Sequence, residues 1–387
     1  MSCQNKIKKY IKENQSTIFS IYGGETYDKN ELKSRFEIIE QYDFVGYLED
    51  IKEKADRAFS KTYTRSEKVA ENIISIVTSN KYSRSGDYEL SDKKKLEEII
   101  QKKIINTVRK NHRLGFVIPG FTTKAFNVLR VESRRLPDLA EFASLIRLYE
   151  ICYQLGKVYP HGAEFVVVTD GLAYSKIFGE DPYFAIAHRQ TLEEWTRRVG
   201  IESTIRIVDL TTLLPKNFNE EYSKTSKALS DEWSRIKNLE ELTDFVANTK
   251  NLVNYESEIV EDMRLFYQFQ DNHGDRELNR DLIEHKVVNK AIHSTFKYEA
   301  FLRTMYRLNV IDHEFKDHIR CTGRPKPGQL GIHMIHEKSY NFPWNGVGVL
   351  RKDGRIDVYP EYKVKYSDKF IPIFIKGDHS AFYYKER

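Results

Sequence analysis

The chain has 387 residues, 40% of them apolar and 13% aromatic, which is enough for a sizeable core in one large domain or two smaller ones. Its formal net charge of +5 is mild for this length, and basic residues are interspersed with acidic ones, so the composition does not favour nucleic-acid binding. Three widely spaced cysteines without a CxxC pair argue against a disulfide framework and against a cysteine zinc site.

The first 65 residues are not predicted to form part of a packed core. Residues 1–65 are charged and interrupted, and we expect an N-terminal extension of short helices or partly disordered chain. The first residues lack the apolar centre of a signal peptide, and no apolar run approaches the length of a bilayer span. We therefore expect a cytoplasmic protein that does not associate with membranes.

The middle of the chain alternates strands with helices. After a mostly helical stretch over residues 61–110, short buried strands are predicted at 115–118, 165–168 and 204–208, and the intervening helices at 137–158 and 183–199. Strands separated by helices pair in parallel through right-handed crossovers. We predict a Rossmann-like α/β domain over residues 66–310, with helical insertions, although no GxGxxG motif marks a dinucleotide site.

The last part of the chain is predicted to be a smaller α+β portion over residues 311–387. Residues 319–322 and 330–335 flank the loop GRPKPGQ, and we expect them to form a hairpin. A second hairpin joins 347–350 to 356–358 through an Asp-Gly turn. Trp344, just before it, is expected to be a packing residue.

Polar residues follow each of the three central strands. Ligands of open α/β sheets bind just beyond the carboxyl ends of the strands, so these residues are candidates for a site. The first strand end offers an anion cradle of hydroxyl, amide and cationic side chains from Thr122, Thr123, Lys124, Asn127 and Arg130, with a solvated loop as the alternative. The second offers Asp170 and then Ser175, and the third offers Asp209.

Acid/base chemistry is the first expectation for this edge. Lys124, Asp170 and Asp209 around one crevice would shift each other's pKa values. The alternative is that Asp170 only caps the turn that follows its strand. His188 lies on a predicted helix and is expected to cover that helix's surface.

The hairpin expected at residues 319–335 carries a second cationic group. Arg320, Arg324, Lys326 and His333 are candidates for binding a phosphate or carboxylate. The His333-x-x-His336 spacing resembles a zinc motif, but residues three apart on a strand point to opposite faces, so we expect no shared metal.

Four segments together resemble the pyoverdine/dityrosine biosynthesis family, the isocyanide (isonitrile) synthases of the PvcA type. They are IPGFTTKAFNVLR from Ile118, the stretch from Leu136 to Gly179, HIRCTGRPKPGQLGIHMI from His318, and FPWNGVGVLRKDGRI from Phe342. The likeness covers about residues 66–360.

The resemblance implies an enzyme that makes an isonitrile from the α-amine of an amino acid, Tyr or Trp above all, with one carbon from ribulose 5-phosphate. It implies no metal and no nicotinamide cofactor, and assigns catalytic roles to Asp170, Lys124 and His333. Thr122, Thr123, Asn127, Arg130, Ser175, Arg320, Arg324 and Lys326 would bind the substrates. A pathway oxygenase as partner and a homodimer stay open.

The chain departs from the family pattern at four positions. Leu172 stands where the family has an arginine, Arg324 where it has a histidine, His333 where it has an arginine, and Asn345 where it has a histidine. If positions 324 and 333 face each other across a hairpin, the imidazole and guanidinium have exchanged places. The departures keep two alternatives open: modification of another amine, and a binding protein without catalysis.

Overall fold

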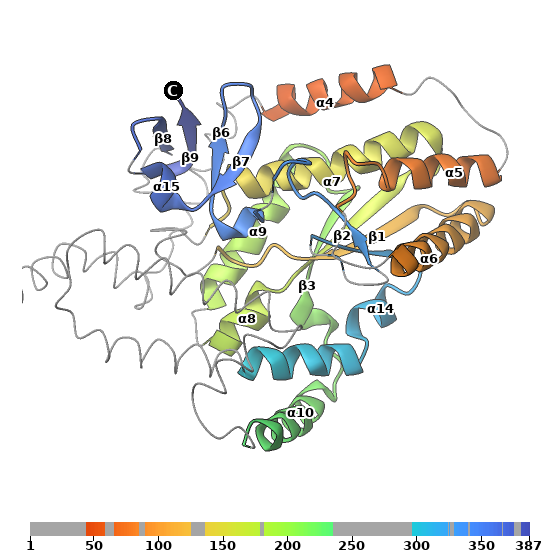
Figure 1. The fold of residues 1–387 in the computed structure, drawn as a ribbon, viewed down its shortest axis with the longest axis vertical. Helices are drawn as coiled ribbons and strands as arrows, with labels where there is room; N and C mark the ends of the chain where they lie inside the picture. Colours follow the sequence, from red (N-terminus) through yellow and green to blue (C-terminus); the bar gives the residue numbers. More distant parts are fainter. Residues whose placement is uncertain are drawn as a thin grey trace, which may run out of the picture.

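The structure is a computed structural model that describes residues 44–58, 66–84, 90–124, 136–178, 182–234, 296–323, 325, 329–339, 341–365, 367–374 and 381–387. Its elements build two sheets with helices packed around them (Figure 1). Before the first strand, the described ranges contain α4 (Phe44–Ala58), α5 (Ser66–Val77) and α6 (Leu90–Arg109).

The main sheet has five parallel strands in the order β3-β2-β1-β4-β5. They are β1 (Leu114–Pro119), β2 (Ala163–Thr169), β3 (Ile205–Asp209), β4 (Ile319–Thr322) and β5 (Leu330–Gly331). The predicted parallel α/β architecture is confirmed, and β1 to β3 are the three strands predicted from apolar runs. The sheet extends past residue 310, where the sequence suggested a division, because β4 pairs with β1.

The expected hairpin at residues 319–335 is wrong. β4 and β5 pair in parallel, with Cys321 opposite Leu330 and Thr322 opposite Gly331. A hairpin requires antiparallel strands, so these two strands, which run in the same direction, are not the arms of a hairpin. The proposed exchange of imidazole and guanidinium between positions 324 and 333 loses its geometric basis.

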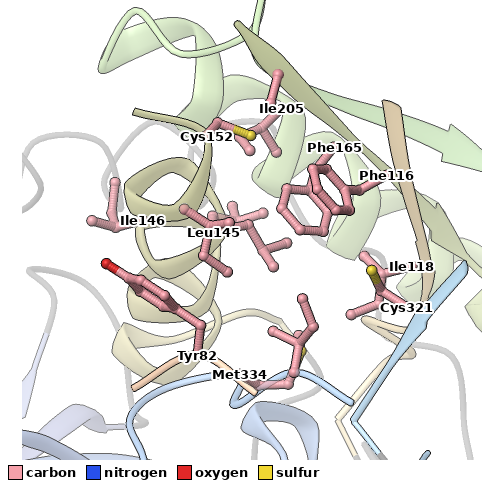
Figure 2. Close-up of a cluster of buried hydrophobic side chains, with 14 of the residues drawn as sticks. Tyr82, Phe116, Ile118, Leu145, Ile146, Cys152, Phe165, Ile205, Cys321 and Met334 are labelled. Carbon is pink, nitrogen blue, oxygen red and sulfur yellow. The ribbon is translucent and has the colours of Figure 1, made fainter. Parts of the chain in front are cut away.

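Helix α7 (Leu139–Val158) covers one face of the main sheet. It starts at a capping box: the Asp138 carboxylate accepts from the backbone of the first turn, and Glu141 accepts from the Asp138 N–H at 2.9 Å. Its buried side packs on the sheet in one large apolar cluster, in which Phe116 and Phe165 stack at 4.9 Å (Figure 2).

Further described helices lie between β2 and β4 in the sequence. They are α8 (Gly171–Phe178), α9 (Pro182–Arg198), η1 (Leu210–Leu213), α10 (Phe218–Trp233), the helical residues 296–307 and α14 (Val310–Glu314). Val117, Val166 and Val168 on the second face of the sheet pack in a cluster with Phe218 and Phe301. This cluster is separate from the one that α7 closes.

A smaller sheet follows in the order β7-β6-β9-β8. Its strands are β6 (Val347–Leu350), β7 (Ile356–Tyr359), β8 (Phe370–Phe374) and β9 (Ala381–Glu386). The short helix η2 (Pro343–Asn345) precedes β6, and α15 (Glu361–Lys365) lies between β7 and β8 in the sequence. β6 and β7 form the predicted hairpin. The sheet lies beside α7 and α9 (Figure 1).

Helix α9 is more enclosed than its sequence suggested. Trp195 packs edge-on against Phe142 of α7 at 5.6 Å and against Phe382 of β9 at 6.2 Å. His188 of α9 is 1% exposed, so the expectation that it covers the surface of that helix is wrong. No helix within the described ranges is long and apolar enough to cross a membrane.

Candidate functional site

The order of the strands locates the crevice where a ligand is expected. From β1 the chain proceeds to β2 and β3 on one side, whereas β4 and β5 lie on the other side. The strand order therefore reverses between β1 and β4. Open α/β sheets bind ligands at the carboxyl ends of the strands beside such a reversal.

The turn that ends β1 has an uncommon backbone. Gly120 has a φ of +159°, and Phe121, which is not a glycine, has a φ of +57°. A positive φ at a bulky residue is costly and is found where the surrounding structure imposes it, often beside functional sites. The turn brings Thr123 to the start of α8, where a Cβ on Gly171 would lie 3.2 Å from the Thr123 nitrogen.

Two stacked aromatic rings from the segment before the smaller sheet pack against the ends of β1 and β4. The Phe342 and Trp344 rings are parallel to within 4° and 5.1 Å apart. Trp344 rests on Gly120, where a Cβ would lie 2.9 Å from the ring, and Phe342 occupies the space that a side chain on Gly323 would need. Glycines at the ends of β1 and β4 thus seat one ring each, which confirms Trp344 as a packing residue.

Asp170 lies where β2 ends and α8 begins. Its side chain is 8% exposed, and Oδ1 is shielded from solvent without a hydrogen-bond partner. Burial raises the pKa of this carboxyl to about 7; a hydrogen bond from the Tyr174 hydroxyl opposes the rise, and the nearby Asp209 carboxylate adds to it. A carboxyl that titrates near neutral pH suits general acid/base chemistry.

Asp209 has a structural role beside Asp170. Its Oδ1 accepts from the Thr211 N–H at 2.7 Å and from the Thr211 hydroxyl at 2.6 Å, which caps η1. Its Oδ2 lies 3.4 Å from the Arg189 guanidinium of α9. Asp209 therefore adds negative charge next to Asp170, while its own oxygens are engaged.

Lys124 is not at the crevice. Its side chain is 1% exposed, and the ammonium donates to the carbonyl oxygens of Pro343 and Gly346, both at 2.8 Å. It also lies 2.8 Å from Glu141 Oε2 and 3.1 Å from Asp138 Oδ2. These four acceptors enclose the ammonium, so in this structure it cannot grip a substrate anion as expected from the sequence. Its contacts instead join the β1 turn to α7 and η2.

Glu141 shares the buried site of Lys124. Burial raises the pKa of Glu141, and the Lys124 ammonium opposes that rise. The Asp138 carboxylate also accepts from the Gly348 N–H at 3.1 Å, which fastens β6 to the start of α7. The cluster of Lys124, Asp138 and Glu141 thus holds the smaller sheet against the main one.

The Arg320 guanidinium has buried nitrogens without hydrogen-bond partners among the described residues. Arg320 lies on β4, opposite Val117 of β1, and its Nε and Nη1 are shielded from solvent without hydrogen-bond partners. Burial lowers the pKa of this guanidinium, and Asp312 on α14 opposes the shift. Buried guanidinium N–H groups are normally paired, so their lack of a partner here favours an anionic ligand at this face.

His333 lies just beyond β5. Its backbone N–H donates to the Tyr82 carbonyl at 2.9 Å, and its ring Nδ1 is shielded without a partner. Burial lowers the pKa of the imidazole, and so do the positive charges of Arg84 and Arg147. Both effects favour the neutral imidazole, which can donate and accept a proton.

The other predicted site residues have varied positions. Thr122 is partly exposed and Thr123 is buried beside α8. The Ser175 hydroxyl is buried and donates to the Leu172 carbonyl at 2.9 Å inside α8, which leaves it no proton to donate to a substrate. Asn127, Arg130, Arg324 and Lys326 lie outside the described residues.

Two further residues lie near the candidate site, although no sequence motif at either position predicted it. Tyr298 lies 3.4 Å from the Tyr174 hydroxyl, although 124 residues separate the two. Arg84 extends over the Phe342 ring at 5.9 Å and its N–H donates to the Gly331 carbonyl at 3.1 Å. Both come from segments that only the tertiary fold brings to the strand ends.

Two of the protein's surface hollows lie elsewhere. One, of about 320 Å³, is lined by residues at the amino ends of the strands, among them Arg113, Ala163 and Thr204. The other lies between α4 and Tyr153. We place the candidate site at the carboxyl ends, because the unsatisfied Asp170, Arg320 and His333 belong to the strands that end there.

Comparisons with known proteins agree with this architecture. The crystal structure of PvcA from Pseudomonas aeruginosa has the same fold, with a TM-score of 0.60 and 18% identity, over 82% of this chain and 100% of that one. The chain is 24% identical over 254 residues to the L-tryptophan isonitrile synthase AmbI2 of Fischerella ambigua, covering 64% of this chain and 71% of the relative.

A second curated relative is the L-tyrosine isonitrile synthase of Pseudomonas aeruginosa, 23% identical over 284 residues that cover 70% of this chain and 80% of the relative. The family model of the pyoverdine/dityrosine biosynthesis proteins matches residues 104–370. That match takes in all five strands of the main sheet and the hairpin of the smaller one, so the chain belongs to the pyoverdine/dityrosine biosynthesis protein family.

Proposed function

We propose that the protein is an isonitrile synthase that converts the α-amine of an amino acid, Tyr or Trp above all, into an isonitrile, with ribulose 5-phosphate as the carbon donor. The relatives named as L-tryptophan and L-tyrosine isonitrile synthases support the class of reaction. The observation that carries the proposal is Asp170: a buried carboxyl with an unpartnered oxygen, at a strand end where α/β proteins bind ligands.

The proposed reaction begins with condensation. The amine nitrogen attacks the sugar ketone, a proton reaches the carbonyl oxygen, and water leaves to give an imine. The sugar skeleton then fragments through further proton transfers. Asp170, which changes charge near neutral pH, is the proposed acid/base for these transfers.

Anionic groups on both substrates need cationic partners. Arg320 is proposed to bind the carboxylate of the amino acid or the phosphate of the sugar, because its shielded Nε and Nη1 have no hydrogen-bond partner among the described residues. His333, with its free Nδ1, is proposed as a second proton-transfer or anion-binding group. Thr122 and Thr123 are proposed to line the same edge.

The test is direct detection of product. The full-length protein is incubated with ribulose 5-phosphate and, one at a time, a panel of amino acids that includes Tyr and Trp; mass spectrometry then seeks the isonitrile and a phosphate assay follows phosphate release. The Asp170→Asn variant, which keeps the shape of the side chain, is expected to lose the product. Absence of isonitrile and phosphate with every amino acid would reject the proposal, and full turnover by the variant would reject the role of Asp170.

A further inference from the structure

We infer that Tyr174 and Tyr298 form a two-hydroxyl chain that carries a proton between Asp170 and the solvent, and that both act as positioning residues for the Asp170 carboxyl. The inference rests on the proposed function of Asp170 as an acid/base. It adds the route by which that buried group exchanges its proton.

The helix geometry aligns the first two members of the chain. Tyr174 is one turn after Asp170, and its backbone N–H donates to the Asp170 carbonyl at 3.0 Å, so both side chains lie on one side of α8. The Tyr174 hydroxyl is close enough to the Asp170 carboxyl to lower its pKa as a hydrogen-bond donor. The Asp170 side chain is therefore positioned by a residue of the helix that follows it.

The third member comes from the helical residues 296–307. The Tyr174 and Tyr298 hydroxyl oxygens are 3.4 Å apart, and the two rings lie 5.2 Å apart at 60°. Phe301, one turn after Tyr298, packs edge-on against Tyr174 at 6.2 Å. Ring contacts on two successive turns fix the position of Tyr174 between the helix and Asp170.

The two tyrosines are more exposed than the carboxyl. Asp170 is 8% exposed, whereas Tyr174 and Tyr298 are both partly exposed. The wall around them is apolar, with Ala173, Leu210 and Phe301 in the same buried cluster. A buried carboxyl in such a wall needs polar groups to reach bulk water, and the two hydroxyls provide them.

Among the residues that the structure describes, few charged or titratable groups face Asp170. They are Tyr174 from α8 and Asp209 from the end of β3, with Tyr298 behind Tyr174 and Arg189 of α9 behind Asp209. Asp209 disfavours a second negative charge, and Tyr174 favours it by donating a hydrogen bond. Removing the Tyr174 hydroxyl should therefore raise the pKa of Asp170.

A hydroxyl both donates and accepts, so the chain can reverse its direction. With Asp170 ionised, Tyr298 donates to Tyr174 and Tyr174 donates to the carboxylate. When Asp170 takes the Tyr174 proton, Tyr174 takes that of Tyr298, and Tyr298 takes one from a hydronium ion in the solvent, which becomes water. Three O–H bonds form and three break, one proton is gained by Asp170, and both tyrosines end neutral. Burial, which raises the pKa of Tyr174, favours that neutral state.

The experiment titrates Asp170 in the full-length protein. Protein labelled with ¹³C at aspartate carboxyls is followed by NMR against pH, and the Asp170 signal is assigned by its loss in Asp170→Asn. Removing the Tyr174 donor in Tyr174→Phe is expected to raise the Asp170 midpoint by roughly one pH unit. Tyr298→Phe leaves that donor in place and is expected to cause a smaller shift in the same direction. The control is Tyr222→Phe, which removes a hydroxyl from α10 within the same apolar cluster and should leave the midpoint unchanged.

Turnover separates the chain from a merely structural role. If the wild type makes isonitrile, Tyr298→Phe should lower kcat with KM unchanged, because the proton route is interrupted and the substrate contacts are kept. An Asp170 midpoint that is the same in Tyr174→Phe and wild type, or an unchanged kcat in Tyr298→Phe, overturns the inference. A wild type that makes no isonitrile rejects the proposed function alone, because the NMR titration still decides whether Tyr174 controls Asp170.

Discussion

The Lys124 ammonium lies 2.8 Å from the Glu141 carboxylate in the interior of the protein, where neither side chain has more than 1% of its surface exposed. The pair joins the end of β1 to the first turn of α7, and the Lys124 bonds to Pro343 and Gly346 extend the connection to the smaller sheet. A cation placed in this way stabilises the walls of the candidate site from behind.

Replacing Lys124 by Met is expected to destabilise the fold by about 3–5 kcal/mol, because two buried carboxylates lose their counter-charge. Chemical denaturation measures the change. Lys81→Met is the control: its ammonium also pairs with a carboxylate, Glu150, but is half-exposed, and the loss should stay below about 1 kcal/mol. Equal losses in the two variants would contradict the role of Lys124.

Asp170→Asn is expected to stabilise the protein at pH 8 but not at pH 4. The folded pKa of about 7 lies above the ordinary aspartate value of 3.8, so the folded state binds more protons than the unfolded state between these values. Wild-type stability therefore falls as pH rises from about 4 to 7, by up to about 4 kcal/mol, and the asparagine variant escapes this loss. Denaturation midpoints at the two pH values measure the difference. A gap between variant and wild type that does not depend on pH would show that Asp170 ionises without cost.

Arg320→Met is expected to have opposite effects on stability and binding. Removing a shielded guanidinium with unpaired N–H groups should stabilise the fold by roughly 1–3 kcal/mol. The same change should raise KM for the anionic substrate that Arg320 binds by roughly 10- to 100-fold. Separate titrations of amino acid and ribulose 5-phosphate identify which anion that is. A destabilised variant with both KM values unchanged would assign Arg320 to structure only.

Gly323→Ala tests the seat of the aromatic pair. The new methyl group would overlap the Phe342 ring and push it against Trp344, at a cost of about 1–3 kcal/mol. Tryptophan fluorescence reports the displacement. Gly156→Ala, in α7 with open space around it, should instead stabilise by roughly 0.5–1 kcal/mol. If both alanines behave alike, Phe342 does not depend on Gly323.

The sequence predicted the central strands because buried parallel strands are continuous apolar runs, as in Phe165 to Val168. It also located Asp170, since a carboxylate directly after such a run lies at the strand end. It failed for β4 and β5, where strands of four and two residues leave almost no periodic signal and a Gly/Pro-rich loop suggests a hairpin.

The environment of individual side chains was beyond local patterns. Lys124, with an asparagine and an arginine soon after it, suggests an exposed anion cradle. Its partners are instead Glu141 in α7 and the carbonyls of Pro343 and Gly346, which lie more than two hundred residues further along the chain. Burial of this kind depends on which distant segments meet. The same applies to Tyr298, whose hydroxyl reaches Tyr174 only through packing of the helical residues 296–307.

The late position of β4 in the chain has a consequence for biosynthesis. β1 is the middle strand of the main sheet, but its neighbour on one side is made about two hundred residues after it. Until the ribosome has released residue 322, the apolar edge of β1 has no strand to pair with and is open to association with other chains. Fragments that stop before this point should aggregate, and the nascent protein is a natural client for chaperones that shield unpaired strand edges.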